Sequence, residues 1–301
     1  MRIAMLRRRM ALAILLATLT ISVSPARGDA AHPFTHWIDA TKGPEPEMQV
    51  QAYDPDTFVV RQSIETNIEG PFVFLFFGSD RALLVDTGAG GLKIRPTIDK
   101  LIADWAKAHG KVSMPLVVAH THAHGDHIAG DPEFTDDPNV QVVGHAPEDV
   151  AAFFKIVHWP DDIAPFDLGD RVIDIIPSPG HEKAELSLYD RRTHLLLSGD
   201  WLYPGRLYFT ASNFDAFRKS VDRVAAFTKS LKVSWILGNH IEMTTRSGRD
   251  FPMHAESHPG EHVLQMPYGR LLELQAAVHR MTAGPYLDVH PDFIVYPLPG
   301  P

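Results

Sequence analysis

The stretch PLVVAHTHAHGDHIAG, residues 115–130, decides how the rest of the chain is arranged. Its first five residues, 115–119, form an apolar run that is typical of a buried strand. Gly125 then lets the backbone turn, so side chains that would alternate between the two faces of the strand can converge. The side chains in this turn that can bind a metal are His122, His124, Asp126 and His127. Imidazole and carboxylate suit zinc and, less selectively, iron or manganese. A solvated loop rich in histidine is the alternative, and the spacing at a strand end argues against it.

The composition narrows the chemistry further. The chain has 301 residues, 45% hydrophobic and 22% charged, which is ordinary for a globular protein. It has no cysteine, which excludes disulfides, thiolate zinc sites and cysteine nucleophiles. Any metal must therefore be bound by histidine, carboxylate or water. Most of the 17 histidines must be bystanders, and we expect His145 and His158 to be structural or exposed.

Residues 1–28 have the pattern of a secretory signal peptide. Four arginines precede the apolar run Met10–Val23, and small residues follow it. The run is short for a membrane span, so we expect no stable membrane anchor and a periplasmic or secreted protein. Three consecutive arginines, 7–9, leave twin-arginine export and the general secretory route both open.

Removal of residues 1–28 takes away five arginines and no acidic residue, which changes the formal charge from −9 to −14. An acidic protein is poorly suited to nucleic acid, so we expect a small-molecule substrate instead.

The periodicity of the remaining sequence predicts strands and helices in alternation, starting at residue 57. The expected strands cover residues 57–61, 72–77, 82–86, 115–119, 140–143, 172–176, 185–189, 194–197 and 234–237, and the expected helices cover 94–108, 147–157, 214–231 and 262–281. We expect an irregular N-terminal extension over 29–56 and one domain over 57–301. Strands followed by a helix, twice over, favour an α/β fold in which two sheets pack face to face with helices outside.

The segment at 120–127 resembles the His-x-His-x-Asp-His signature of the metallo-β-lactamase superfamily. Four further residues match that family's landmarks in the family's order: Asp86, His181, Asp200 and His240. The resemblance implies a four-layer αββα sandwich and a dinuclear metal site.

Carried over residue by residue, the resemblance implies two divalent ions, expected to be Zn²⁺ with Fe or Mn as alternatives. The first ion would be bound by His122, His124 and His181, the second by Asp126, His127 and His240, with Asp200 bridging and Asp86 supporting a ligand histidine. In the mechanism that this implies, a hydroxide shared by the two ions attacks a carbonyl carbon. Asp126 orients the nucleophile and passes a proton to the leaving group.

The substrate is less well specified. Within the resemblance, an aspartate at position 200 argues against the dedicated β-lactamase branches and favours glyoxalase II-like, lactonase-like and phosphodiesterase-like branches. Tyr203 is either a substrate contact, as in acyl-homoserine lactonases, or an ordinary loop aromatic. Asn239, beside His240, is a second candidate contact. The loops 63–71, 201–214 and 241–261 are expected to form the walls of the cleft; their apolar candidates for contact are Tyr203, Leu207, Tyr208, Phe209, Phe214 and Met243.

The sequence therefore predicts an exported, dinuclear, metal-dependent hydrolase that acts on a small ester, thioester or lactone. Hydrolysis of β-lactams, a metal-retaining binding protein with little turnover and redox chemistry at iron are the alternatives. The natural substrate, the metal and the oligomeric state stay open.

Overall fold

The computed structural model describes residues 33–299. The predicted signal peptide, residues 1–28, lies outside this range. Within it, the strands are β1 (Met48–Asp54), β2 (Thr57–Gln62), β3 (Phe72–Phe77), β4 (Ala82–Val85), β5 (Leu116–Ala119), β6 (Val140–Val142), β7 (Ala164–Asp167), β8 (Val172–Pro177), β9 (Leu186–Asp190), β10 (Leu195–Gly199), β11 (Arg206–Thr210), β12 (Trp235–Gly238), β13 (Gln265–Met266), β14 (Asp288–Val289) and β15 (Ile294–Leu298). The α-helices are α1 (Arg95–Ala108), α2 (Gly125–Ile128), α3 (Pro147–Phe154), α4 (Phe214–Thr228) and α5 (Gly269–Arg280).

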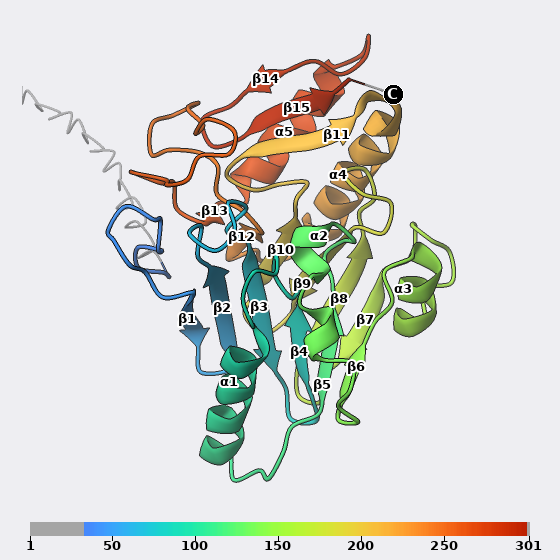
Figure 1. Ribbon diagram of the computed structural model, residues 1–301. Helices are drawn as coiled ribbons and strands as arrows, with labels where there is room; N and C mark the ends of the chain where they lie inside the picture. The colour runs from blue at the N-terminus through green and yellow to red at the C-terminus, as the bar shows by residue number, and fades with distance from the viewer. Residues whose placement is uncertain (1–32, 300–301) are drawn as a thin grey trace, which may run out of the picture. The chain divides into compact units, whose positions relative to one another are not determined.

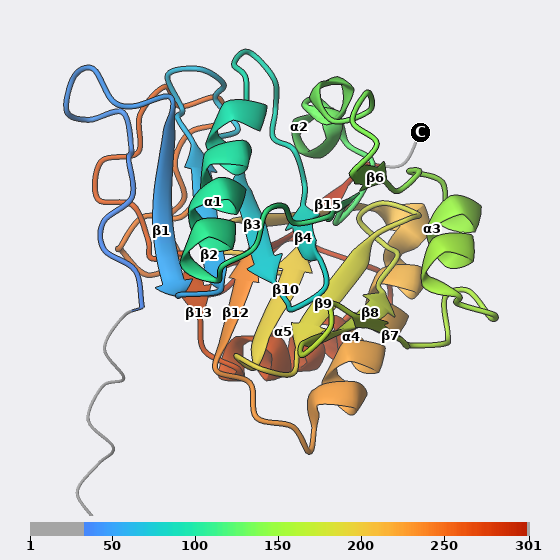
Figure 2. The ribbon, with the colours of Figure 1, turned by 90° about the horizontal axis from the view of Figure 1, so that it is seen from below.

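Two mixed sheets face each other between layers of helices (Figures 1 and 2). The first sheet has the strand order β1-β2-β3-β4-β5-β6, and the second has the order β13-β12-β10-β9-β8-β7. Helix α1 covers the outer face of the first sheet, and α4 and α5 cover the outer face of the second (Figure 2). A smaller sheet, β11-β15-β14, lies at the end of the sandwich where the second sheet leads into α4.

Three hydrophobic clusters fill the three interfaces between these four layers. The strand β3 contributes to two of these clusters, because its alternate side chains point to opposite faces of the sheet. Phe72, Phe74 and Phe76 belong to the cluster between the sheets. Val73, Leu75 and Phe77 belong to the cluster under α1. The third cluster joins the second sheet to the apolar face of α4 and α5. A strand that is apolar on both faces therefore marks the centre of the sandwich.

The structure corrects the predicted N-terminal extension. Residues 48–54, predicted to be irregular, form the edge strand β1, which pairs antiparallel with β2. Its sequence MQVQAYD alternates apolar and polar residues, but an edge position leaves most of them only half-buried. Phe34 and Trp37, also within the predicted extension, pack into the cluster between the sheets. The folded domain thus begins before residue 57.

The C-terminal part also differs from the prediction. The expected helix over 262–281 is confirmed only as α5, because residues 265–266 form β13 beside β12 and Pro267 disfavours helical geometry before it. Helix α3 ends at Phe154 because Lys155 adopts a left-handed conformation, with φ of 61°. The strands β7, β11 and β14 were not predicted, and β15 was expected only as an extended terminus.

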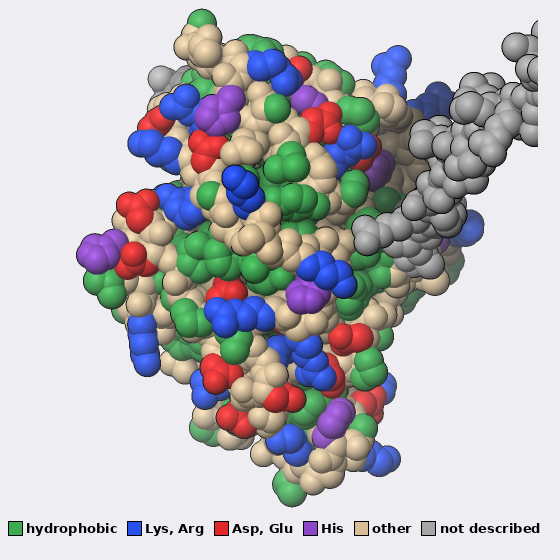
Figure 3. Space-filling model, turned by 180° about the vertical axis from the view of Figure 1, so that it is seen from behind, with side chains coloured by type: hydrophobic (Ala, Val, Ile, Leu, Met, Phe, Trp, Pro, Cys, Tyr) green, Lys and Arg blue, Asp and Glu red, His purple; other side chains and the backbone are tan. Residues whose placement is uncertain are grey.

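Charges of both signs are interspersed on the face of the molecule seen from behind (Figure 3). Within residues 33–299, no helix is both long and apolar enough to cross a membrane.

Candidate metal centre

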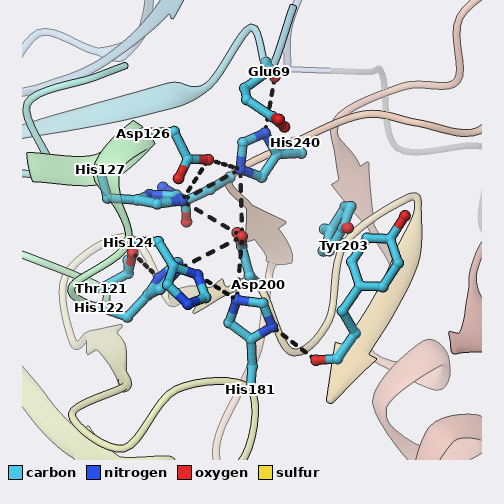
Figure 4. A network of polar contacts seen from close by, with 12 residues as sticks. Glu69, Thr121, His122, His124, Asp126, His127, His181, Asp200, Tyr203 and His240 are labelled. Carbon is cyan, nitrogen blue, oxygen red and sulfur yellow. Dashed lines mark hydrogen bonds and ion pairs between the residues drawn. The ribbon is translucent and has the colours of Figure 1, made fainter. Parts of the chain in front are cut away.

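The seven ligands predicted from the sequence converge at one edge of the two sheets (Figure 4). Each lies just after the carboxyl end of a strand. The segment 120–127 follows β5 and runs into α2, His181 follows β8, Asp200 follows β10 and His240 follows β12. A strand end fixes the direction of the backbone, and the loop that follows is free to aim a side chain at a shared point.

Two glycines allow these loops to pack closely enough. A Cβ atom at Gly180, just before His181, would lie 2.4 Å from the Cα atom of Phe217 in α4. A Cβ atom at Gly238, two residues before His240, would lie 2.2 Å from the Cβ atom of Tyr203. At His181 and at His240, the preceding glycine therefore allows the end of the strand to approach the neighbouring element closely.

The first group of ligands consists of three histidines. Nδ1 of His124 lies 3.0 Å from Nε2 of His122 and 3.0 Å from Nε2 of His181. A tetrahedral metal with bonds of 2.0–2.1 Å to nitrogen separates its ligand atoms by about 3.3 Å. The spacing of the three nitrogens fits one such ion.

The second group consists of two histidines and a carboxylate. Oδ2 of Asp126 lies 3.3 Å from Nε2 of both His127 and His240, and these two nitrogens are 3.3 Å apart. Asp200 joins the groups, because its Oδ2 lies 3.4 Å from Nε2 of His240 and 3.7 Å from Nε2 of His122. The position of Asp200 is that of a bridging ligand.

Hydrogen bonds outside the centre determine which ring nitrogen faces inward. Nδ1 of His181 donates to the carbonyl oxygen of Tyr208 at 2.7 Å, and Nδ1 of His240 donates to that of Glu69 at 2.9 Å. Nδ1 of His127 donates to Asp86 at 3.1 Å. Since a neutral imidazole carries one proton, Nε2 of each of these three rings presents a lone pair to the centre.

His122 is oriented in the same way. The hydroxyl group of Thr121 donates to Oδ2 of Asp86, so its oxygen is free to accept a hydrogen bond from Nδ1 of His122 at 3.2 Å. The Nε2 lone pairs of His122 and His181 therefore both face Nδ1 of His124. A single cation placed between these three nitrogens would accept a lone pair from each of them.

The buried Asp200 gives a second test of fit to a metal. Its side chain is 9% exposed, and its Oδ1 atom has no hydrogen-bond partner among residues 33–299. A buried carboxylate oxygen without a partner is costly, and coordination to a cation would remove that cost. Donor chemistry, spacing and this orphaned oxygen all fit two divalent cations.

Asp86 is the organising residue behind the ligands. Its φ angle of 69° is left-handed, a conformation that costs about 1–2 kcal/mol for a residue other than glycine. Its Oδ1 accepts a hydrogen bond from the Thr121 N–H, and its Oδ2 accepts hydrogen bonds from the Thr121 hydroxyl, His127 and the Asn239 amide. These four hydrogen bonds hold the strained turn in place. The predicted supporting position of Asp86 agrees with this geometry.

The electrostatics of the metal-free centre favour the protonation state that metal binding requires for His122 and Asp200, whereas His127 and His240 would give up a proton to a cation. Burial lowers the pKa of His122 well below its ordinary value, and the neighbouring His127 lowers it further. Burial would raise the pKa of Asp200, but His240, His127 and His122 outweigh it and bring that pKa well below its ordinary range. Burial would also lower the pKa of His127, but the carboxylates of Asp200 and Asp86 raise it above its ordinary value. The carboxylates of the centre are therefore ionised at neutral pH.

Glu185, immediately before β9, lies behind Asp200 and was not identified from the sequence. It is fully buried, its Oε1 accepts a hydrogen bond from the Asp200 N–H at 3.1 Å, and its Oε2 has no partner. Burial raises the pKa of Glu185 well above its ordinary value, and the Asp200 carboxylate adds to this. Nothing in its local sequence distinguishes it from an ordinary residue at the start of a strand.

A third group of metal-binding residue types lies nearby: His120, Asp131 and His145. Here every contact is a normal hydrogen bond. The carboxylate of Asp131 accepts from Nε2 of His120 at 2.8 Å, from Nε2 of His145 at 2.7 Å and from the hydroxyl of Thr87 at 2.8 Å. We name these residues the Asp131 clamp. The prediction that His145 is structural agrees with this arrangement, and His158 is 77% exposed.

The structure does not support the two candidate substrate contacts. Asn239 is fully buried, and its amide donates to Asp86 and to the carbonyl oxygen of Phe72, so it lies behind the ligands. Tyr203 is 3% exposed, and its hydroxyl donates to the carbonyl oxygen of Arg206. Asn239 is therefore corrected to a structural role, and for Tyr203 the geometry favours an ordinary loop aromatic over a substrate contact.

A pocket opens beside His240. All three predicted wall segments contribute to it, and its lining is Ile68, Glu69, Arg206, Tyr208, His240, Ile241, Glu242, Phe251, Pro252, Met253, His254, Ala255 and His258. Of the six apolar residues predicted for the wall, Tyr208 is the one found in this lining. Leu207, Phe209 and Met243 are core residues instead.

Comparisons with known proteins agree with the geometry. The sequence model of the metallo-beta-lactamase superfamily matches residues 67–260. The chain is 26% identical to the acyl-coenzyme A thioesterase MBLAC2 of Gallus gallus over 206 residues, which cover 57% of this chain and 72% of that enzyme. It is 30% identical to a hydroxyacylglutathione hydrolase of Ectopseudomonas mendocina (strain ymp) over 132 residues, which cover 43% of this chain and 49% of that enzyme.

Among solved structures, a metallo-beta-lactamase from Pontibacter korlensis has a TM-score of 0.50 and 16% sequence identity. The match covers 77% of this chain and 99% of that one. At this identity the match shows the fold alone. The αββα sandwich and the metal-dependent hydrolase predicted from the sequence are confirmed.

Proposed function

The chain belongs to the metallo-beta-lactamase superfamily, and we propose that it hydrolyses small thioesters, and by the same chemistry esters and lactones, with two divalent metal ions. The observation that carries this proposal is that five imidazole rings and the carboxylates of Asp126 and Asp200 converge, with their ligand atoms close enough to share metal ions. The two relatives bear the names of a thioesterase and of a hydroxyacylglutathione hydrolase. These names support a thioester as the first substrate to test.

The residues that would hold the two ions are the two groups described above, with Asp200 between them. Two divalent cations in such a site lower the pKa of a water molecule toward neutrality and polarise a carbonyl group. The hydrogen bonds from Nδ1 of His181, His240 and His127 keep three Nε2 atoms facing inward throughout the reaction.

Asp126 is the group placed to move a proton. Its side chain is 22% exposed, whereas that of Asp200 is 9% exposed, so a substrate entering from solvent meets Asp126 first. In the reaction a C–O bond forms, the C–S bond breaks, and the sulfur leaves as a thiol once it has gained a proton. We assign to Asp126 the proton transfer from the attacking water to this leaving sulfur.

A substrate panel tests the proposal. Purified, metal-loaded protein is assayed with a thioester, an ester, a lactone and the β-lactam nitrocefin. We expect kcat/KM to be highest for the thioester. Turnover of nitrocefin alone would replace the proposal with β-lactam hydrolysis, and binding without turnover of any compound would identify a metal-retaining binding protein.

We also propose that the protein works outside the cytoplasm after removal of residues 1–28. The arginines and the apolar run of this segment support export. Mass spectrometry of the protein from periplasmic and culture fractions should detect a chain that begins near residue 29. Recovery of the full-length chain from the cytoplasm alone would overturn this part of the proposal.

A further inference from the structure

The pocket beside His240 has room for a small chemical group. Its volume is about 130 Å³, and cavities of about 150 Å³ in other proteins bind benzene. A thioester has two parts, an acyl group and a thiol. A short acyl group fits this volume, whereas a thiol as large as coenzyme A or glutathione does not.

Much of the lining is apolar. Ile241 and Phe251 form buried walls, with 2% and 7% exposure. At the rim, Ile68 and Met253 are 38% and 52% exposed and so add apolar surface at the mouth of the pocket. An apolar acyl chain would cover both rim residues on entering.

The pocket contains a single arginine, and its guanidinium group is already occupied. Nε of Arg206 donates to Asp250 at 2.8 Å, Nη1 donates to Glu242 at 3.0 Å, and Nη2 donates to the carbonyl oxygen of Phe251. Arg206 is 4% exposed. An anionic substrate group would have to displace one of these partners, so Arg206 does not serve as an anion receptor.

The carboxylate of Glu69 is in the opposite situation. Glu69 is exposed at the pocket wall and, among residues 33–299, its carboxylate forms no ion pair and accepts no hydrogen bond. Its backbone carbonyl oxygen accepts a hydrogen bond from His240, so Glu69 lies next to the metal centre. A second negative charge in the pocket would meet the Glu69 carboxylate, and the lining offers no free lysine or arginine to compensate it.

We infer that this pocket is an acyl-binding subsite that takes a short, uncharged acyl group and rejects acyl groups that carry a carboxylate. The inference rests on the proposed function, because it assigns the acyl half of that substrate to the pocket. The metal centre would polarise the reacting carbonyl, which all acyl groups share, so the residues of the pocket discriminate between acyl groups.

The test compares two thioesters of N-acetylcysteamine, a small neutral thiol. The butyryl and succinyl thioesters have acyl chains of the same length and differ in a terminal methyl group against a carboxylate. We expect kcat/KM for butyryl to exceed that for succinyl by at least about tenfold. Equal rates, or a preference for succinyl, would overturn the inference while leaving thioester hydrolysis in place. Absence of turnover with both would instead overturn the proposed function.

Two variants locate the discrimination. Glu69→Gln should reduce the preference for butyryl about fivefold, since it removes the uncompensated charge. Glu65→Gln is the matched control: it removes the same charge from an exposed residue of the same loop that does not line the pocket, and it should leave the preference unchanged. An equal effect of both variants would show a general charge effect and would contradict a subsite at Glu69.

A steric variant and a binding measurement complete the test. Ala255→Phe fills the pocket and should lower the ratio of butyryl to acetyl hydrolysis about tenfold. Calorimetry with ketone analogues, in which a CH₂ group replaces the thioester sulfur, should show the same butyryl-over-succinyl preference without turnover. An unchanged chain-length ratio in Ala255→Phe would place the acyl group elsewhere.

Discussion

The metal centre and the Asp131 clamp are two neighbouring groups of the same residue types with different contacts. In the clamp, Asp131 accepts three hydrogen bonds of 2.7–2.8 Å, and each donor has its acceptor. In the centre, the contacts of Asp200 with ring nitrogens are 3.4–3.8 Å, and its Oδ1 has no partner. The clamp is complete as it stands, whereas the centre is complete only with cations.

The difference arises from the ring nitrogen that each histidine presents. In the centre, backbone carbonyls and Asp86 accept the Nδ1 protons, so that Nε2 of three rings faces the other ligand atoms. In the clamp, the Nε2 protons of His120 and His145 point at the carboxylate itself. Residue type alone therefore does not identify a metal site; the partners of the other ring nitrogen do.

The largest effect expected from this comparison is loss of a ligand. His122→Ala or Asp200→Ala should remove bound metal and lower kcat/KM by roughly a thousandfold or more, since loss of an outer hydrogen-bond partner alone costs about 10–100-fold in metal proteins. Metal content by mass spectrometry and thioester turnover measure the two losses. His145→Ala and His158→Ala serve as controls, and equal losses in all four variants would discredit the ligand assignment.

Removal of metal should come next in size. The apo centre keeps its closely spaced ligand groups and, among residues 33–299, an unpaired carboxylate oxygen, so chelation should destabilise the protein. Binding at a thousand times Kd contributes about 4 kcal/mol, which corresponds to a shift in Tm of about 10 °C for a domain of this size. Thermal unfolding with chelator, and again after addition of zinc, measures the shift. An unchanged Tm would mean that the centre binds no cation tightly.

The clamp should show the opposite behaviour. Asp131→Ala leaves the buried Nε2 donor of His120 without an acceptor and leaves the Thr87 hydroxyl only the carbonyl oxygen of His127, which should lower the free energy of unfolding by about 2–3 kcal/mol. At saturating zinc the variant should still bind two ions per chain. Urea unfolding and metal stoichiometry test the two statements, and loss of one ion would make the clamp part of the metal site.

Glu185 should give a smaller effect on the centre. Glu185→Leu removes the acceptor of the Asp200 N–H and should weaken binding of one ion about tenfold. Glu185→Gln keeps a carbonyl oxygen at the same place and should restore the affinity. Competition with a chelator measures the affinity, and the unfolding of both apo variants controls for a purely structural defect. Equal affinities of the two variants would contradict a positioning role.

The fold could be predicted where the sequence pattern is long and periodic. The run FVFLFF at β3 and the helices α1 and α4 were predicted almost residue for residue, because burial on two faces or on one helical stripe leaves a clear pattern. The edge strand β1 and the short strands of the small sheet were missed or only partly anticipated. Their residues are half-buried or pair with distant segments, as β11 does with β15, and such pairing leaves no local signal.

At the site, the ligands could be predicted because they match the landmarks of the family that the chain resembles, in order and at strand ends, and the structure brings all seven together. The residues that orient them could not. Thr121 orients His122 through its hydroxyl group. Glu69 and Tyr208 act through backbone carbonyl oxygens. Glu185 accepts a hydrogen bond from the backbone N–H of Asp200, 15 residues away in the sequence. A backbone carbonyl is present at every position, so its role depends on geometry alone. The role of Asn239 depends on geometry in the same way, because its amide bonds to Asp86 and to the carbonyl oxygen of Phe72, both far away in the sequence.

The smallest expected effect is the pH dependence of the clamp. Burial raises the pKa of Asp131, but the hydrogen bond and charge of His120, together with Thr87, outweigh it, so the folded-state pKa lies below the ordinary value of 3.8. The unfolded chain therefore takes up the proton first as the pH falls. The stability that the Asp131 charge contributes should be fully present above pH 3.8 and should be lost as the pH falls through the lower, folded-state pKa.

The comparison of the wild type with Asp131→Asn isolates this contribution. Both proteins are studied with chelator, so that loss of metal at low pH does not enter the difference. The gap between their free energies of unfolding in urea should be constant from pH 6 to pH 5 and should narrow below about pH 4. A gap that widens as the pH falls would mean that the folded state, not the unfolded chain, takes up the proton first. Asp131 would then act as a neutral acid, and the clamp would lose the charge that distinguishes its carboxylate from an amide.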